Sequence, residues 1–78
     1  MTKILIVEDE RPIANLIDWN LTASGYQCTR AYDGNAAADL LVEHSFDLVL
    51  LDIMLPGIDG YELLKQIKPT GTPVIFIT

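Results

Sequence analysis

The sequence is poor in cysteine, in basic residues and in long apolar runs. Its single cysteine, Cys28, excludes an intramolecular disulfide framework and a cysteine-rich zinc site. Only 5 residues are Lys or Arg against 11 acidic ones, and the net charge of −6 would repel DNA or RNA, so we expect no direct nucleic-acid binding by this segment. No apolar run approaches the length of a membrane span, and the acidic residues after Val7 argue against a signal peptide. We therefore expect a cytoplasmic protein that does not enter a membrane.

The 78 residues, half of them hydrophobic, are enough for one domain with a small core. Short apolar runs alternate with segments whose apolar residues recur at helical spacing. The predicted strands are Ile4–Val7, Tyr26–Ala31, Leu48–Leu51 and Val74–Ile77, and the predicted helices are 11–24, 35–43 and 60–68. This alternation predicts an α/β fold with a parallel sheet and helices on its faces.

Local signals also predict helix ends and inward faces. Gly25 is the expected stop of the first helix, and Asp33 and Asp59 are the expected caps of the other two. The residues expected to face the core are Ile13, Leu16, Ile17 and Leu21 in the first helix and Tyr61, Leu64 and Ile67 in the last. Trp19 is expected to be partly buried, and the Met54 side chain is expected to pack in its loop.

Three predicted strands end on polar residues. Glu8 and Asp9 follow the first strand, Asp52 follows the third, and Thr78 follows the last. Ligands of open α/β sheets bind at the carboxyl ends of the strands, so we expect these residues to converge. Their hard oxygen atoms favour Mg²⁺, and a carboxylate there can attack phosphorus to give an aspartyl phosphate. The alternative is that such acids are only solvated residues before a helix, which we prefer for Glu10.

Three segments resemble the receiver domains of bacterial response regulators. The segment Asp47–Glu62 (DLVLLDIMLPGIDGYE) is similar to their phosphoacceptor strand and the loop after it. Ile4–Glu10 (ILIVEDE) resembles their first strand with its acidic pair, and Thr72–Thr78 (TPVIFIT) resembles their fourth strand. Within the middle block, Met54–Gly57 is similar to the OmpR/PhoB subfamily of transcription factors.

The resemblance implies a flavodoxin-like, doubly wound parallel sheet of order 2-1-3-4, with residues 1–78 as the N-terminal part of a single receiver domain. In the family a fifth strand, the last helices, a lysine and a switch aromatic lie beyond the position of Thr78, so the domain is expected to be incomplete. The implied site places the phosphoacceptor at Asp52. Asp9, Asp52 and the backbone carbonyl of Met54 would bind Mg²⁺, Glu8 would bind it through water, and Thr78 would contact the phosphoryl group as a switch residue.

The resemblance implies a phosphoprotein of two-component signal transduction rather than an enzyme. Asp52 would receive its phosphoryl group from a sensor histidine kinase and control an output domain for transcription regulation. One alternative is a phosphorylation-deficient interaction module or fragment. A second is a haloacid-dehalogenase-like phosphatase, which would need an acid where Met54 stands. We also expect a homo-oligomer through the edge formed by Val74–Ile77, because an uncovered apolar strand favours pairing.

Overall fold

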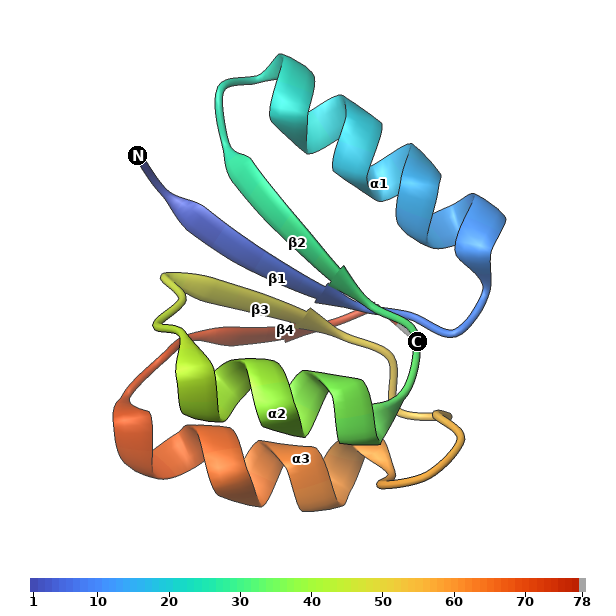
Figure 1. Cartoon of the computed structure of the whole chain (residues 1–78), viewed down its shortest axis with the longest axis vertical. Coiled ribbons are helices and arrows are strands. Elements are labelled where there is room, and N and C mark those ends of the chain that lie inside the picture. The colour runs from blue at the N-terminus through green and yellow to red at the C-terminus, as the bar shows by residue number, and fades with distance from the viewer. Residues whose placement is uncertain (78) are drawn as a thin grey trace.

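Four parallel strands and three α-helices alternate along the chain in a computed structural model that describes residues 1–77 (Figure 1). The elements are β1 (Lys3–Val7), α1 (Arg11–Ala23), β2 (Gln27–Ala31), α2 (Gly34–Glu43), β3 (Leu48–Leu51), α3 (Gly60–Ile67), the 3-10 turn η1 (Lys68–Thr70) and β4 (Val74–Phe76). Each predicted strand and helix is present, with ends within one residue of the prediction. Thr78, predicted at the site, lies outside the described residues.

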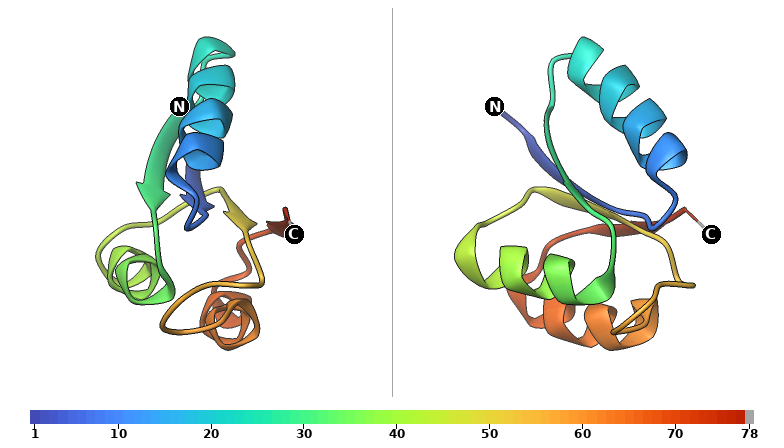
Figure 2. Two further views of the ribbon diagram at one scale, coloured as in Figure 1. Left: turned by 90° about the vertical axis from the view of Figure 1, so that its right-hand side faces the viewer. Right: turned by 45° about the vertical axis from the view of Figure 1, so that its right-hand side comes forward.

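The strands form one sheet in the order β2-β1-β3-β4, and every neighbouring pair is parallel. Helix α1 covers one face of the sheet, and α2 and α3 cover the other (Figures 1 and 2). The predicted flavodoxin-like α/β fold and strand order are confirmed. The chain leaves β1 for β2 on one side and reaches β3 on the other, so the crevice at which such folds bind ligands lies at the carboxyl ends of β1 and β3.

The core lies in two layers, one on each face of β1. Leu5 and Val7 point toward α2 and α3, whereas Ile4 and Ile6 point toward α1. These four side chains are almost fully buried, as a central parallel strand requires. Because β1 is packed on both faces, the residues that follow it have a fixed position at the crevice. Within residues 1–77, no helix has both the length and the apolar character needed to cross a bilayer.

Helix α1 contacts the sheet along a narrower line than its apolar pattern predicts. Ala14 is fully buried, and Ile17 and Leu21 pack beside it against the same cluster. The predictions for Ile13, Leu16 and Trp19 were wrong, because all three side chains are exposed in the described part of the chain. Ala14, Ile17 and Leu21 lie along one line of the helix, and the three exposed residues lie outside that line.

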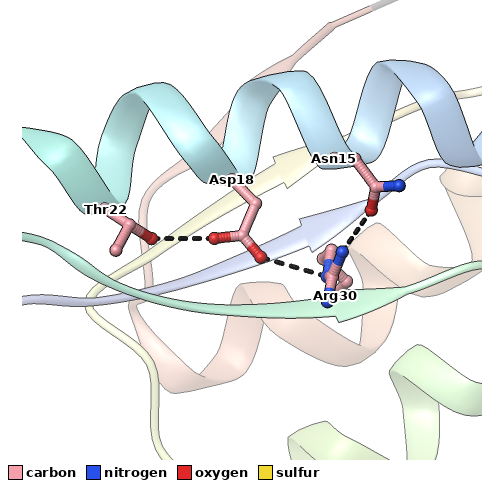
Figure 3. Close-up of polar contacts among 4 residues, drawn as sticks. All are labelled: Asn15, Asp18, Thr22 and Arg30. Carbon is pink, nitrogen blue, oxygen red and sulfur yellow. Dashed lines mark hydrogen bonds and ion pairs between the residues drawn. The ribbon is translucent and has the colours of Figure 1, made fainter.

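A polar network holds α1 against strand β2 (Figure 3). The Arg30 Nε atom lies 3.0 Å from Asp18 Oδ2, and the same side chain donates a hydrogen bond to Asn15. Thr22 donates from Oγ1 to the other oxygen of Asp18 at 2.8 Å. The network ties α1 to the edge strand through two contacts of Arg30.

The N-cap of α3 lies where the sequence predicts it, but one of the residues predicted to face the core does not. Asp59 caps it as expected, because its Oδ1 accepts the Glu62 N–H at 3.0 Å. The prediction that Tyr61 faces the core was wrong: Leu63 and Ile67 are the buried residues. Tyr61 lies at the helix edge, with its ring centroid 6.3 Å from that of Phe76 in β4. The cap at Asp33 is also confirmed, since its Oδ1 accepts the Ala36 N–H at 2.7 Å.

Candidate metal centre

Three carboxylates meet at the carboxyl ends of β1 and β3. Glu8 and Asp9 follow β1, and Asp52 follows β3, whose last residue is in register with Val7. One carboxylate oxygen from each of the three residues lies within 4.8 Å of the other two. The sheet therefore brings together acidic residues that are separated by more than forty positions in the sequence.

The backbone ladder of the sheet continues past the strands and holds two of these residues firmly. The Glu8 N–H donates to the Ala31 carbonyl at 3.0 Å, and the Asp52 N–H donates to the Val7 carbonyl at 2.9 Å. Both side chains are buried, with 4% of Glu8 and 6% of Asp52 exposed. Asp9 is exposed, so the centre has a buried floor and one side open to solvent.

The surroundings of Glu8 disfavour the charged form of its carboxyl group. Burial, together with hydrogen bonding to Asp52 and Asp9, raises the pKa of Glu8 from 4.5 to about 7. The Glu10 N–H, 3.4 Å from Glu8 Oε2, acts in the opposite direction and lowers this pKa. A proton therefore competes with any cation for the centre near neutral pH.

Asp52 is oriented by the loop that follows it. The Met54 N–H donates to Asp52 Oδ1 at 3.0 Å, which fixes one carboxylate oxygen, and the Met54 side chain points outward. That side chain is 80% exposed, so the prediction that it packs in the loop was wrong. The role of the Met54 carbonyl as a metal ligand stays a prediction.

Gly60 is a structural contributor to the centre that the sequence analysis missed. Its N–H donates to the Ile53 carbonyl at 3.0 Å, and α3 starts against the backbone after Asp52. A Cβ atom at Gly60 would lie 2.6 Å from Ile53 Cα and 2.9 Å from the Asp52 carbonyl oxygen. The available signal was a glycine directly after the Asp59 cap, where a stronger helix former is expected.

The donor set fits a hard divalent cation. It consists of three carboxylates, and the centre found within residues 1–77 includes neither a thiolate nor an imidazole. Mg²⁺ is typically held by one or two carboxylates and keeps several waters, which suits two buried acids beside an exposed one. Glu8, Asp9 and Asp52 are therefore the residues that could hold Mg²⁺, while Thr78 lies outside the described residues.

Comparison with known proteins identifies the family of the chain. The family model of the response regulator receiver domain matches residues 4–78. The receiver domain of the Francisella response regulator 1452 is 33% identical with a TM-score of 0.90, and the Thermotoga maritima response regulator TrrA, solved in complex with Mg²⁺ and BeF, is 34% identical with a TM-score of 0.86. The receiver domain of the hybrid histidine kinase CckA is 37% identical with a TM-score of 0.89.

These matches cover 97%, 97% and 95% of this chain, and 64%, 66% and 72% of the respective solved chains. The chain thus spans about two thirds of the length of the solved structures that it matches. The family match over residues 4–78, the strand order and the three carboxylates at the crevice agree. The chain belongs to the family of response regulator receiver domains.

Proposed function

We propose that this chain is a phosphoacceptor in a two-component system and that Asp52 receives the phosphoryl group. The observation that carries the proposal is the position of Asp52: buried, held by the Met54 N–H and within 4.8 Å of two further carboxylates. Phosphoryl transfer depends on positioning and charge neutralisation more than on acid–base chemistry. A rigid aspartate beside a cation site suits that demand.

In the proposed step, the phosphoryl group moves from a phosphohistidine of the sensor kinase to Asp52. The N–P bond breaks, the histidine nitrogen keeps the electron pair, and a bond forms between phosphorus and Asp52 Oδ2. Oδ1 stays held by the Met54 N–H, 3.0 Å away, so the attacking oxygen has one orientation. The product is an acyl phosphate on the chain itself, so the chain acts in this step as an acceptor rather than as an enzyme.

Charge neutralisation is the contribution that we assign to Mg²⁺. Asp9 and Asp52 would bind it directly, the Met54 carbonyl would add a ligand, and Glu8 would bind through water. When bound, the cation would offset the repulsion between the carboxylates and an incoming phosphoryl group. Thr78, outside the described residues, is proposed to contact the transferred group.

Phosphorylation by acetyl phosphate in the presence of Mg²⁺ tests this function. Intact mass should show one added phosphoryl group, and Asp52→Asn should lose it. Asp39→Asn is the matched control, since Asp39 is an exposed carboxylate on α2 away from the centre. Equal labelling of the wild type and Asp52→Asn would place the acceptor elsewhere and reject the proposal.

An interaction module without phosphoacceptor activity is the alternative. Beryllofluoride with Mg²⁺ distinguishes the two, because it imitates a phosphoryl group on an aspartate. A phosphoacceptor should show amide shifts centred on Asp52, and Asp52→Asn should not. An interaction module should show none in either protein.

The signalling context is proposed from the family and from Met54–Gly57. We propose that phosphorylation of Asp52 controls an output domain of OmpR/PhoB-like type that regulates transcription. Phosphotransfer from candidate histidine kinases and DNA-binding assays of the phosphorylated full-length protein test this assignment. Phosphorylation that leaves DNA binding unchanged would contradict it.

We further propose self-association through β4. Ile75 and Phe76 are exposed on this edge strand, which pairs with β3 on one side within the described residues. Exposed apolar edges favour pairing with another strand. Sedimentation of the 78-residue chain should show a dimer or larger species that Ile75→Lys shifts to monomer, and a folded monomer in the wild type would exclude the association.

A further inference from the structure

Arg11, the first residue of α1, stacks on the ring of Tyr32. The guanidinium carbon lies 4.0 Å from the ring centroid, within the range of a cation–π contact. Tyr32 is partly buried and packs against the core cluster that contains Ile4, Ile6 and Ala14. The ring is anchored in the core, so the cation above it is held at a defined place.

The backbone that carries this pair adjoins the backbone that carries the three carboxylates. Arg11 follows Asp9 by two residues, which keeps the two Cα atoms within about 7 Å. Tyr32 directly follows Ala31, whose carbonyl accepts the Glu8 N–H at 3.0 Å. Both members of the pair are therefore attached to backbone that also positions the metal centre.

Arg11 is the basic residue that the described chain places at this end of the sheet. Lys3 begins β1 at the opposite end, Lys65 lies in the last turn of α3, and Lys68 begins η1. Arg30 is bound to Asp18 and Asn15 (Figure 3). Arg11 forms no ion pair within residues 1–77, and stacking leaves the N–H groups at the edge of its guanidinium able to donate.

We propose that Arg11, held by Tyr32, is a positioning residue that attracts and orients the phosphoryl group of the donor at Asp52. This inference rests on the proposed phosphoacceptor function. A dianionic donor is repelled by three carboxylates, and a guanidinium offers charge and paired N–H donors to phosphate oxygens. With acetyl phosphate, the bond from acyl oxygen to phosphorus breaks, acetate keeps the electron pair, and Asp52 binds phosphorus; Arg11 exchanges no proton.

The test measures two properties of the same variants: the second-order rate constant for phosphorylation by acetyl phosphate, and the affinity for Mg²⁺. In Arg11→Gln the rate constant should fall by about three- to tenfold, while Mg²⁺ binding should tighten by about twofold because a repelling charge is gone. A merely structural role would weaken both. Arg11→Lys should recover part of the rate, and Tyr32→Leu should give an intermediate loss because the cation is no longer held.

Lys3→Gln is the matched control. It removes one positive charge at the opposite end of β1, and its rate constant should stay within about twofold of the wild type. If the wild type is not phosphorylated, both the proposed function and this inference fail. If the wild type is phosphorylated but Arg11→Gln is unchanged, or loses rate and Mg²⁺ affinity together, only the role of Arg11 is overturned.

Discussion

Glu8 is the residue whose chemistry depends most on its surroundings. It is buried beside Asp52 and Asp9, and its pKa is raised to about 7. An ionised Glu8 therefore costs free energy in the metal-free fold, and a bound cation would remove that cost. We therefore expect Glu8 to link the stability of the domain to pH and to Mg²⁺.

The metal-free protein should lose stability as the pH rises from about 5 to 8. The folded-state pKa of Glu8, about 7, lies above its ordinary value of 4.5, so the folded state binds the proton more tightly than the unfolded state. The stabilisation that protonated Glu8 gives the folded state is fully present below pH 4.5 and is lost as the pH rises through 7. Urea unfolding in EDTA at pH 5 and pH 8 measures it.

Glu8→Gln is the variant for comparison, because glutamine does not titrate. The wild type should lose on the order of 1–3 kcal/mol more than Glu8→Gln between the two pH values. The difference between the two proteins isolates this group from the other carboxylates. A difference that stays constant from pH 5 to pH 8 would show that burial does not raise the pKa of Glu8.

Gly60 occupies a position where the neighbouring backbone leaves no room for a side chain. Gly60→Ala would force a Cβ atom to 2.6 Å from Ile53 Cα, so the backbone after Asp52 must move. We expect a loss of about 1–3 kcal/mol in the free energy of unfolding, as for other overpacked sites, and weaker Mg²⁺ binding. Urea unfolding and Mg²⁺ titration measure the two effects.

Gly25→Asn is the control for this substitution. Gly25 ends α1 with φ of +98°, and no atom lies within 4 Å of the place that a Cβ would take. A loss of stability below about 1 kcal/mol is expected there, with unchanged Mg²⁺ binding. Equal effects of the two substitutions on Mg²⁺ would contradict the role given to Gly60.

At the scale of elements, α3 and its preceding loop determine how Asp52 is presented. The loop is closed by the Gly60 N–H on the Ile53 carbonyl, and the helix start is closed by Asp59 on the Glu62 N–H. Leu63 and Ile67 then bury the helix against the sheet. The orientation of Asp52 thus depends on a helix that starts eight residues later in the chain.

Asp59→Ala should lower the free energy of unfolding by about 1 kcal/mol, because it removes an N-cap. Chemical denaturation measures this loss. Asp39→Ala is the matched control: it removes the same charge from an exposed position within α2 and should be nearly neutral. An equal loss in the two variants would assign the effect to charge rather than to capping.

At the scale of the whole molecule, binding at the carboxyl ends of β1 and β3 couples to folding. The three carboxylates come from two strands, so the centre exists only when the sheet is formed. An ion that binds this centre stabilises the fold as a whole. The net charge of −6 adds a general attraction for cations.

Mg²⁺ should therefore raise the melting temperature at pH 8. At a free concentration of one hundred times Kd, the stabilisation should be about 2.7 kcal/mol. Asp52→Ala should lose most of this effect, whereas Asp39→Ala should keep it. Thermal unfolding at several Mg²⁺ concentrations provides the measurement, and an equal response of Asp52→Ala would place the ion elsewhere.

The sequence by itself determined the order of the strands and helices, the caps at Asp33 and Asp59, and the three acidic residues that follow strands. These features depend on local signals: apolar periodicity, turn residues and capping side chains. Local patterning did not decide which apolar residues of α1 and α3 are buried. Leu16 and Tyr61 have the same helical period as their buried neighbours, but the sheet contacts only one line of each helix.

Only the tertiary structure decided the distances between residues far apart in the chain. The approach of the three carboxylates to within 4.8 Å of one another and the raised pKa of Glu8 require β1 and β3 side by side. The stacking of Arg11 on Tyr32 and the close approach of Gly60 to Ile53 likewise require the packed helices. Such features arise from packing, burial and charge between separate elements, and local periodicity carries no information about them.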